Sequence, residues 1–454
     1  MTPLSDPHVI QPFTQPINGS VSLPGSKSIS NRSLLLAAMS QRRVVLHDCL
    51  FSRDTEIMMQ ALQTLGFTVE SDPVTRRIEV EGLGGSIPVA EADIDVGNSG
   101  TSARLLTAFL AIRNGGVYHL DGDEPMRKRP MRGLLTALES SGAATIEYHA
   151  EPGFFPFTLK THGYAGGTMK ADASESSQIL SALMMALPFA KKDTTVHVLG
   201  VKMRTPYVVM TLDMMEQFGQ AGSCDFTTLT FHISAGCPYP DAPANYVVEP
   251  DASAASYFLA LPAATGGELT IHGLGAARLQ GDLEYAQVLE HAGLKIERDL
   301  DRWIVREAES GLVGATTDFY QISDTFLTQA AVAALMETPT RITGIGHTRH
   351  QETDRIAAMA TELGKLGVRV EEGEGEMTIY PDRAKMREVA ADGPIAIDTY
   401  EDHRVAMSFG VLGSYDLFGD GRPWISIKDP KCCSKTFPDF FHVLESLREE
   451  SVTA

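Results

Sequence analysis

Apolar and polar residues alternate in six short segments of the chain, which is the pattern of a half-buried β-strand. These segments begin at Val44, Val117, Thr195, Glu268, Arg341 and Trp424. Each is followed by a polar loop and then by a segment that opens at Asp or Pro, as helices often do. The same order of elements recurs about every 75 residues, so the pattern predicts six copies of one α/β unit.

Two series of predicted helices keep this period. The first opens near Asp54, Pro130, Pro206, Asp282, Asp354 and Pro438, and five of its helices end at Gly66, Gly142, Gly219, Gly293 and Gly367. Glycine suits these ends because it adopts the left-handed conformation that terminates a helix. The second series has Ala- and Leu-rich bodies and opens near Ser28, Thr101, Ser177, Ser253, Asp324 and Asp402, all capping-type residues.

The six predicted units divide into two sets of three. A Pro-rich segment at residues 237–250 separates the sets and is typical of a linker. The residues before Pro24 precede the first unit and contain a possible strand, GSVSL. That strand could join the C-terminal half.

Composition and charge exclude several classes of protein. The chain has 454 residues, of which 43% are hydrophobic, and its formal net charge is −20. This composition is globular, and so acidic a body repels nucleic acid and anionic lipid, so neither is an expected partner. The first residues lack a secretory signal, and the longest apolar run, Ile179–Ala190, is shorter than the roughly 20 residues of a membrane helix. We therefore expect a cytoplasmic protein without a membrane anchor.

The cysteines agree with a reducing compartment. The five cysteines include no Cys-x-x-Cys pair, and no Cys/His group has the spacing of a zinc site. We expect no metal.

Basic residues recur at the predicted helix starts, where unpaired N–H groups already favour anions. The second helix series carries Lys27, Arg32, Arg104, His403 and Arg404, and the first carries Arg53, Arg127 to Arg129, Lys202, Arg204, Arg349, Arg355, Lys431 and Lys435. A single surface arginine is usually only solvated. Recurrence at one structural position instead predicts a strongly cationic cleft, if the helix starts of both halves face it.

Acidic residues and a histidine occupy the same positions in the last two units. Asp324 and Glu352 belong to the fifth unit, and Asp402 and His403 to the sixth. Carboxylates among arginines are natural general bases and proton carriers. Simple N-capping would explain where Asp324 and Asp402 lie, but it would not explain the neighbouring Glu352 and His403.

Several motifs resemble those of one family of enzymes. They are LPGSKSISNRS from Leu23, GNSGTSAR from Gly97, RPM from Arg129, SSQ from Ser176, ETDR from Glu352, DHRVAMSF from Asp402 and KTFPDFF from Lys435. In this order they resemble the 5-enolpyruvylshikimate-3-phosphate synthase family, and they span all six predicted units.

The resemblance implies a fold of the α/β class, a two-domain inside-out α/β barrel in which each domain has three βαβαββ repeats. It implies one domain of residues 1–22 and 245–454, a second of residues 23–244, and an active site in the cleft between them. The implied reaction moves the enolpyruvyl group of phosphoenolpyruvate to the 5-hydroxyl of shikimate 3-phosphate and releases phosphate through a tetrahedral intermediate. No cofactor takes part, and we expect a monomer with these two small molecules as its partners.

The resemblance also implies which residues bind the substrates. Those expected at phosphoenolpyruvate are Lys27, Asn98, Gly100, Thr101, Arg129, Gln178, Arg355, Arg404 and Lys435. Those expected at shikimate 3-phosphate are Ser28, Arg32, Ser176, Ser177, Gln178, Arg204, Tyr207, Asp324, His347 and Gln351. Arginine forks suit the carboxylate and phosphate groups of these ligands.

The catalytic residues expected from the same motifs are Lys27, Asp324, Glu352, Asp402 and His403. Asp324 is the candidate for taking the hydroxyl proton, and Glu352 and Lys27 are the other proton-transfer groups. Asp402 and His403 would assist or position them.

The chain departs from the family pattern at four positions: Leu105, Arg204, His347 and Gln351. Gln351 stands where many members have Lys, so we expect Arg204 to supply the missing charge. Three alternatives stay open: a related acceptor, the sister enolpyruvyl transferase that acts on UDP-N-acetylglucosamine, and a non-catalytic anion-binding protein. The second generally has a loop Cys that DGDEPMRKRPM lacks, and the third would not need Asp324, Glu352 and His403 together.

Overall fold

The computed structural model describes residues 3–174, 176–199, 205–236, 238–307 and 310–453. The chain forms two compact units. Unit 1 comprises Met1–Pro24 and Pro250–Ala454, and unit 2 comprises Gly25–Glu249. Arg204 and Lys202, two of the predicted basic residues, lie outside the described residues.

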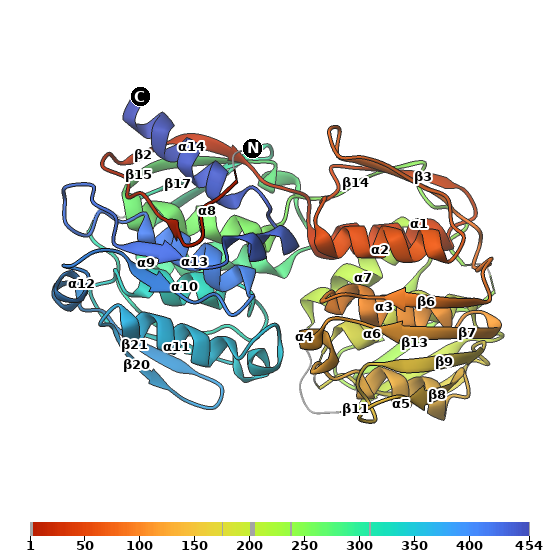
Figure 1. The fold of residues 1–454 in the computed structure, drawn as a ribbon. Coiled ribbons are helices and arrows are strands. Elements are labelled where there is room, and N and C mark those ends of the chain that lie inside the picture. The colour runs from red at the N-terminus through yellow and green to blue at the C-terminus, as the bar shows by residue number, and fades with distance from the viewer. Residues whose placement is uncertain (1–2, 175, 200–204, 237, 308–309, 454) are drawn as a thin grey trace. The chain divides into compact units, whose positions relative to one another are not determined.

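Three four-stranded sheets belong to unit 2 (Figure 1), and in each the first pair of strands is parallel and the other pairs are antiparallel. The first is β14–β3–β5–β4 (Asn245–Val247, Arg43–His47, Arg77–Glu81, Val69–Asp72). The second is β6–β7–β9–β8 (Glu91–Asp95, Asn114–Asp121, Phe157–His162, Ala144–Tyr148). The third is β10–β11–β13–β12 (Gly167–Asp172, Thr194–Leu199, Thr230–Ile233, Gly222–Asp225).

The described strands of unit 1 form three sheets with the same order of parallel and antiparallel pairs. The first is β2–β15–β17–β16 (Ile17–Ser22, Gly267–His272, Arg302–Arg306, Lys295–Arg298). The second is β18–β19–β21–β20 (Thr316–Asp318, Thr340–Thr343, Met377–Tyr380, Arg369–Glu372). The third is β22–β23–β1 (Ile395–Ile397, Ile425–Ile427, His8–Val9).

Six sheets of one pattern confirm the six-fold repeat, but two repeats exchange their first strand. β2 precedes the helices of the first repeat in the chain, yet it pairs in parallel with β15 of unit 1 (Figure 1). β14, which lies beyond the predicted division at residue 244, pairs in parallel with β3 of unit 2. In the sixth repeat, β1 from the N-terminal segment takes the antiparallel position beside β23.

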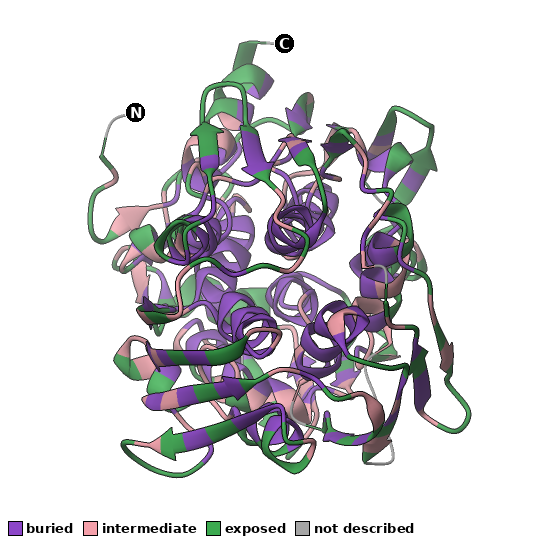
Figure 2. Ribbon diagram, turned by 90° about the vertical axis from the view of Figure 1, so that its right-hand side faces the viewer, coloured by how far each residue is buried: buried purple, intermediate pink, exposed green. Residues whose placement is uncertain are grey.

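The second predicted helix series forms the interior of each unit, as the inside-out architecture requires. In unit 2 these helices are α1 (Lys27–Met39), α3 (Gly100–Leu110) and α6 (Gln178–Ala186). In unit 1 they are α8 (Ala252–Thr265), α10 (Phe326–Ala333) and α13 (His403–Gly413). Every residue of α3, α10 and α13 is buried, and such helices are purple along their length in Figure 2.

The first helix series packs with one face buried. It comprises α2 (Arg53–Thr64), α5 (Arg132–Ser140), α7 (Pro206–Gln217), α9 (Tyr285–Ala292), α11 (Arg355–Lys365) and α14 (Phe440–Thr453). The five glycines predicted to end these helices all have positive φ, from 72° at Gly142 to 119° at Gly293, so this prediction is confirmed. Shorter helical segments are α4 (Glu124–Arg127), α12 (Arg383–Val389), η1 (Leu187–Phe189), η2 (Leu274–Ala276), η3 (Gly281–Glu284), η4 (Gly346–His350) and η5 (Pro430–Lys435).

The predicted caps are correct at some helices and wrong at others. Asp354 and Asp402 are the N-caps of α11 and α13, and their side chains accept backbone N–H groups of the first turn. Asp324 is not a cap, because α10 begins after Thr325. Ser52 rather than Asp54 precedes α2. Asp324 and Asp54 therefore do not cap these helices, and their side chains can make other contacts.

In the part of the chain that the structure describes, no helix has the length and apolar character needed to cross a bilayer.

Candidate active site

The predicted site residues fall into two clusters, one in each unit. The unit 1 cluster comprises Asp324, Glu352, Arg355, Asp402, His403, Arg404 and Lys435. The unit 2 cluster comprises Lys27, Ser28, Arg32, Gly100, Thr101, Arg129 and Gln178, together with Asp54 and Arg104.

Arg355 is the centre of the unit 1 cluster. Its guanidinium is 1% exposed and donates to three carboxylates, at 2.7 Å to Asp402 Oδ2, 3.1 Å to Asp324 Oδ1 and 2.9 Å to Glu352 Oε2. Burial opposes the charge, but the three carboxylates outweigh it and raise the pKa of Arg355 above its usual value. A buried cation is stable only when paired in this way.

The position of Arg355 follows from the start of α11. Asp354 accepts the backbone N–H of Ala357 at 3.0 Å and so fixes the first turn. Arg355 is the first residue of that turn. Arg349 also donates to Asp354, at 2.7 and 2.9 Å, which holds the capping carboxylate in place.

Two further cations complete the cluster. Arg404 donates from Nη2 to Asp324 Oδ2 at 3.1 Å, and Lys435 Nζ lies 2.9 Å from Glu352 Oε1. Arg355, Arg404 and Lys435 thus alternate with Asp324, Glu352 and Asp402. An anionic ligand that binds these cations must compete with the protein's own carboxylates.

Asp402 and His403 lie at the start of α13 and are buried, at 0% exposure each. Asp402 Oδ1 accepts the backbone N–H of Arg404 at 2.9 Å and lies 3.7 Å from His403 Nδ1. The carboxylate therefore contacts Arg355 and caps α13 at the same time. It fixes the direction in which His403 and Arg404 leave the helix.

His347 and Gln351 lie near this cluster but have partners within the protein. His347 Nε2 is 2.9 Å from Ser323 Oγ, and its ring meets the Tyr320 ring edge-on at 5.4 Å. The amide oxygen of Gln351 accepts a hydrogen bond from Arg355. Gln351 thus adds a polar contact to Arg355 but no charge.

In unit 2, Lys27 opens α1 and forms an ion pair with Asp54. Lys27 Nζ lies 3.3 Å from Asp54 Oδ2, and the two side chains are 13% and 2% exposed. Ser26 caps the same helix by accepting the backbone N–H of Ile29. The start of α1 therefore carries a nearly buried cation beside a capped helix N-terminus.

Arg32 joins three helices of unit 2. Its Nε donates to Thr211 Oγ1 and its Nη2 to Ser181 Oγ, both at 2.8 Å, and its Nη1 donates to the Ser28 carbonyl at 3.1 Å. The guanidinium also lies 6.0 Å from the centre of the Tyr207 ring. Burial lowers the pKa of Arg32 to about 10, so the group is still charged at neutral pH.

Gly100 opens α3 where two guanidinium groups approach the backbone. A Cβ at this position would lie 2.6 Å from Arg129 Nη2 and 2.9 Å from Arg104 Nη1. Glycine is therefore needed here for the close approach of both side chains.

Gln178 and Arg104 link α3 to α6. Arg104 donates to Gln178 Oε1 at 3.2 Å and to the Pro130 carbonyl at 2.9 Å, and Gln178 Nε2 donates to Thr101 Oγ1 at 3.0 Å. The amide of Gln178 is thereby oriented through both of its polar atoms.

Comparison with known proteins assigns the chain to a family. Residues 13–444 match the family model of EPSP synthase (3-phosphoshikimate 1-carboxyvinyltransferase). The chain is 46% identical to the 3-phosphoshikimate 1-carboxyvinyltransferase of Opitutus terrae over 453 residues, which cover 99% of each protein. It is 42% identical to that of Nostoc punctiforme, over 95% of this chain and 97% of the relative.

The chain belongs to the EPSP synthase family.

Solved structures of more distant relatives share the fold. The EPSP synthase of Acinetobacter baumannii has a TM-score of 0.76 at 24% identity and covers 96% of this chain and 97% of its own. The enolpyruvyl transferase NikO of Streptomyces tendae has a TM-score of 0.72 at 17% identity and covers 96% of both chains. These likenesses agree with the two-domain α/β architecture.

The remaining residues expected from the EPSP synthase motifs lie beside the unit 2 cluster. Ser177 is the N-cap of α6, and Ser176 Oγ accepts the backbone N–H of Gln178 at 3.3 Å. The side-chain oxygen of Asn98 is buried and has no hydrogen-bond partner among the described residues. Tyr207 is the second residue of α7.

Two residues of these clusters, and Tyr257 close to the unit 1 cluster, were not predicted as part of the EPSP synthase site. Asp54 and Arg104 were expected only as a helix start and a recurring cation, because their partners are distant in sequence. Tyr257 is buried on α8 within electrostatic reach of Arg404, and burial raises its pKa above the usual value. No local pattern marks such a tyrosine as different from a core residue.

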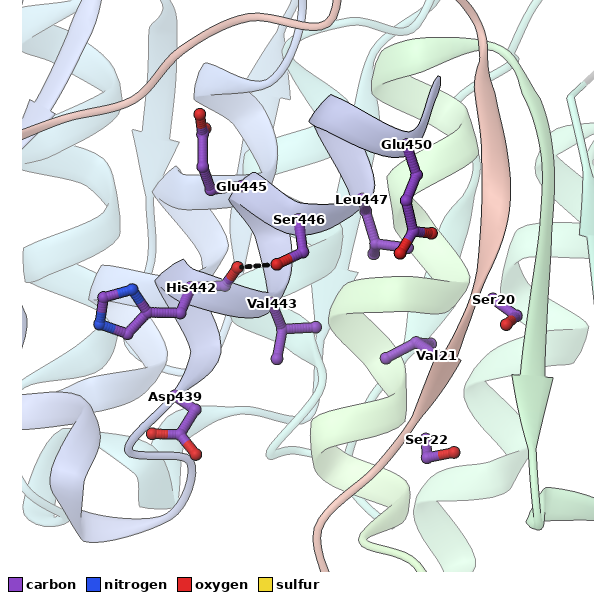
Figure 3. A pocket seen from close by; sticks show the side chains of 10 residues that line it. All are labelled: Ser20, Val21, Ser22, Asp439, His442, Val443, Glu445, Ser446, Leu447 and Glu450. Carbon is purple, nitrogen blue, oxygen red and sulfur yellow. Dashed lines mark hydrogen bonds between the residues drawn. The ribbon is translucent and has the colours of Figure 1, made fainter. Parts of the chain in front are cut away.

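A groove elsewhere in unit 1 contains none of the expected substrate-binding or catalytic residues. It lies between β2 and α14 and has a volume of about 520 Å³ (Figure 3). Its lining includes Asp439, Glu445 and Glu450. An acidic lining does not suit the anionic ligands that the two clusters would bind.

The described residues also include no group of three or more His, Cys, Asp and Glu side chains arranged to hold a metal ion.

Proposed function

We propose that the protein transfers the enolpyruvyl group of phosphoenolpyruvate to the 5-hydroxyl of shikimate 3-phosphate and releases phosphate. Family membership and the names of the curated relatives support this reaction. The observation that carries the proposal is the unit 1 cluster, in which Arg355 contacts Asp324, Glu352 and Asp402. This arrangement provides anion-binding groups and proton-transfer groups within hydrogen-bonding distance of one another.

Phosphoenolpyruvate carries a carboxylate and a phosphate, so its site needs several cations. In this proposal Arg355, Arg404 and Lys435 bind it from unit 1, and Lys27 and Arg129 bind it from unit 2. Guanidinium groups can bind both anionic groups through paired N–H donors. Asn98, Gly100, Thr101 and Gln178 line the same pocket, and the side-chain oxygen of Asn98 is buried there without a hydrogen-bond partner among the described residues.

Shikimate 3-phosphate would bind to hydroxyl groups and to Arg32. Ser28, Ser176 and Ser177 lie at or next to the starts of α1 and α6, where N–H groups favour phosphate. Arg32 uses three of its five N–H donors within the protein and is nearly buried. Its remaining N–H donors can therefore bind the ligand while the side chain keeps its position.

Gln178, Tyr207, His347 and Gln351 would complete the acceptor site with hydrogen bonds. The predicted contribution of Arg204 stays a prediction, since that residue lies outside the described ones.

The chemistry requires two coordinated proton transfers. Asp324 takes the proton of the 5-hydroxyl while that oxygen attacks the C2 atom of phosphoenolpyruvate, and an acid protonates the methylene carbon. The resulting tetrahedral ketal phosphate loses phosphate as the methyl group gives up a proton, which restores the double bond. Glu352 and Lys27 are the candidates for the transfers at carbon, and Asp402 and His403 position the groups around them.

Neither cluster alone has the complete set of groups. The unit 1 cluster holds the proposed catalytic acids and His403, whereas the unit 2 cluster holds Lys27, Arg32, Arg129 and Ser28. We therefore propose that both clusters act on one pair of substrates. Exclusion of water around those substrates would strengthen the ionic contacts to them.

The oligomeric state and location are also proposals. One chain supplies both clusters, so the reaction needs no second copy, and we propose a monomer. We propose a cytoplasmic location because the curated relatives are named for the same biosynthetic reaction.

The proposed function is tested by measuring phosphate release from phosphoenolpyruvate with different acceptors. We expect release with shikimate 3-phosphate and none with UDP-N-acetylglucosamine. Release only with unphosphorylated shikimate would indicate the related-acceptor alternative. If none of the three acceptors supports phosphate release, the assignment as an enolpyruvyl transferase of this kind is overturned.

A further inference from the structure

The segment of residues 398–402 leads into α13 and contacts α11 at two separate places. One is the contact of Arg355 with Asp402, at 2.7 Å. The other lies seven residues further along α11, at Glu362, which is also on the side of the helix that faces this segment. The second contact involves no residue that is expected to touch a substrate.

Glu362 is a buried carboxylate with three donors. Its Oε1 accepts the hydroxyl of Tyr400 at 2.5 Å, and its Oε2 accepts Lys365 Nζ at 2.7 Å and the backbone N–H of Asp398 at 3.1 Å. Its exposure is 0%. Burying a carboxylate without partners would destabilise the fold. These three contacts offset the cost of desolvating Glu362.

The ends of the held segment are further tied by charge. Asp398 accepts from Lys365 at 2.6 Å and from Lys428 at 2.7 Å. These two lysines lower the pKa of Asp398 below its ordinary value. Glu362 and Asp398 thus share Lys365. These contacts fix the position of Asp398, the first residue of the segment.

The backbone between the two contacts is strained. Tyr400 and Glu401 are consecutive non-glycine residues in the left-handed region, with φ of 55° and 57°. Residues with side chains disfavour this conformation, so it persists only where surrounding contacts impose it. Asp402 follows at once, its N–H donating to the Thr399 carbonyl at 2.8 Å.

We propose that Glu362 and Tyr400 form a clamp that positions Asp402, His403 and Arg404 for the reaction. The clamp holds the strained turn, and the turn sets where Asp402 caps α13 and where Arg404 points. Glu362 and Tyr400 are positioning residues, since they act through Asp402 and Arg404. The role assigned to Arg404 rests on the proposed function.

The first test measures the clamp without any substrate. Tyr400→Phe removes the hydroxyl that Glu362 accepts, and Glu362→Gln keeps the size of the side chain but removes its charge. Hydrogen–deuterium exchange should become about three- to tenfold faster in peptides covering residues 398–406 in both variants, the effect of losing one net hydrogen bond. Tyr380→Phe is the matched control, because Tyr380 makes a 2.8 Å hydrogen bond with the exposed Glu371 on the neighbouring strand β20.

The second test measures the steady-state kinetics of phosphate release. If Arg404 is mispositioned, the KM for phosphoenolpyruvate should rise several-fold in Tyr400→Phe and Glu362→Gln, and the KM for shikimate 3-phosphate should change little. A loss of folded protein would lower the apparent kcat and leave both KM values unchanged. Tyr380→Phe should change neither KM.

The outcomes separate the clamp from the proposed function. Unchanged exchange at residues 398–406 overturns the clamp, and faster exchange with both KM values unchanged overturns its role in positioning Arg404. If the wild-type protein releases no phosphate with shikimate 3-phosphate, the proposed function fails, while the exchange experiment still decides whether the clamp exists.

Discussion

Asp324 lies between two guanidinium groups, and this position decides what its side chain can do. Oδ1 accepts from Arg355 and Oδ2 from Arg404, both at 3.1 Å. Thr325 serves as the N-cap of α10 in its place. A carboxylate held by both oxygens, and 14% exposed, is oriented for proton transfer rather than for capping.

Asp324→Asn should lower kcat for phosphate release by about 100- to 10,000-fold, the range expected for loss of a general base. Asn has the same shape but accepts a proton poorly. Asp318→Asn is the control, since Asp318 caps a loop turn through the Tyr320 N–H at 2.8 Å. A fall in kcat below tenfold for Asp324→Asn would remove it as the base.

Gly100→Ala should weaken phosphoenolpyruvate binding without unfolding the protein. The new Cβ would lie 2.6 Å from Arg129 Nη2, and the end of a flexible arginine side chain can move away. We expect the KM for phosphoenolpyruvate to rise by about tenfold, equal to about 1.4 kcal/mol of lost binding, with a smaller change for shikimate 3-phosphate.

Gly364→Ala provides the comparison for Gly100→Ala. Gly364 lies in α11, and a Cβ there would meet open space. Its KM values should equal those of the wild type, and an equal rise in both variants would contradict the steric explanation.

At the scale of the elements, the helix caps place the reactive side chains. Asp354 and Asp402 cap α11 and α13, and Arg355 and Arg404 are in the first turns of these helices. The cap therefore sets where each guanidinium leaves the helix. The left-handed turn before Asp402 extends this dependence to Glu362 and Tyr400.

Asp354→Ala should reduce both stability and activity. Loss of an N-cap costs about 0.5–2 kcal/mol, and the displaced first turn would move Arg355. Asp382→Ala removes a similar cap, on α12, where Asp382 accepts the Lys385 N–H at 2.9 Å. Urea unfolding should show a loss in both variants, whereas kcat/KM should fall only for Asp354→Ala; an equal fall would show that capping affects activity only through stability.

The whole molecule carries a formal charge of −20, yet many of its carboxylates are paired. Pairing or hydrogen bonding lowers the pKa of Asp72, Asp121, Glu124, Glu147, Asp225, Glu371 and Asp398. Burial raises that of Asp213 and Asp429. The first group is larger, so it should determine how stability changes with acid.

A carboxylate whose pKa is lower in the folded state stabilises the fold above its unfolded pKa. That contribution is lost as the pH falls through the folded pKa. The free energy of unfolding should therefore decrease below about pH 4, the ordinary range for these groups. Urea titrations from pH 7 to pH 3 would measure it.

Asp398→Asn should make this acid dependence less steep, because the variant lacks one of the groups responsible. An unfolding free energy that increases on acidification would contradict the expectation.

Much of the fold could be predicted because its signals are local. The strands beginning near Val44 and Val117, and helix ends such as Gly66 and Gly142, are marked by short patterns. The pairing of β2 with β15 confirms the expectation that the N-terminal strand could join the C-terminal half. The pairing of β14 with β3 has no such mark, since β14 precedes the helix of one repeat and pairs with another. The family motifs supplied most of the candidate site residues for the same reason, because the motifs are short and ordered.

The sequence by itself determined the six repeats, the ends of their helices and the family. These depend on periodicity, on glycine's backbone freedom and on contiguous motifs, all of which are properties of short segments. Only the tertiary structure decided that Arg355 is neutralised by Asp402, 47 residues away, and that Glu362 holds Tyr400, 38 residues away. Burial makes such contacts obligatory, because a buried charge requires a partner, but it does not mark the partner in the sequence.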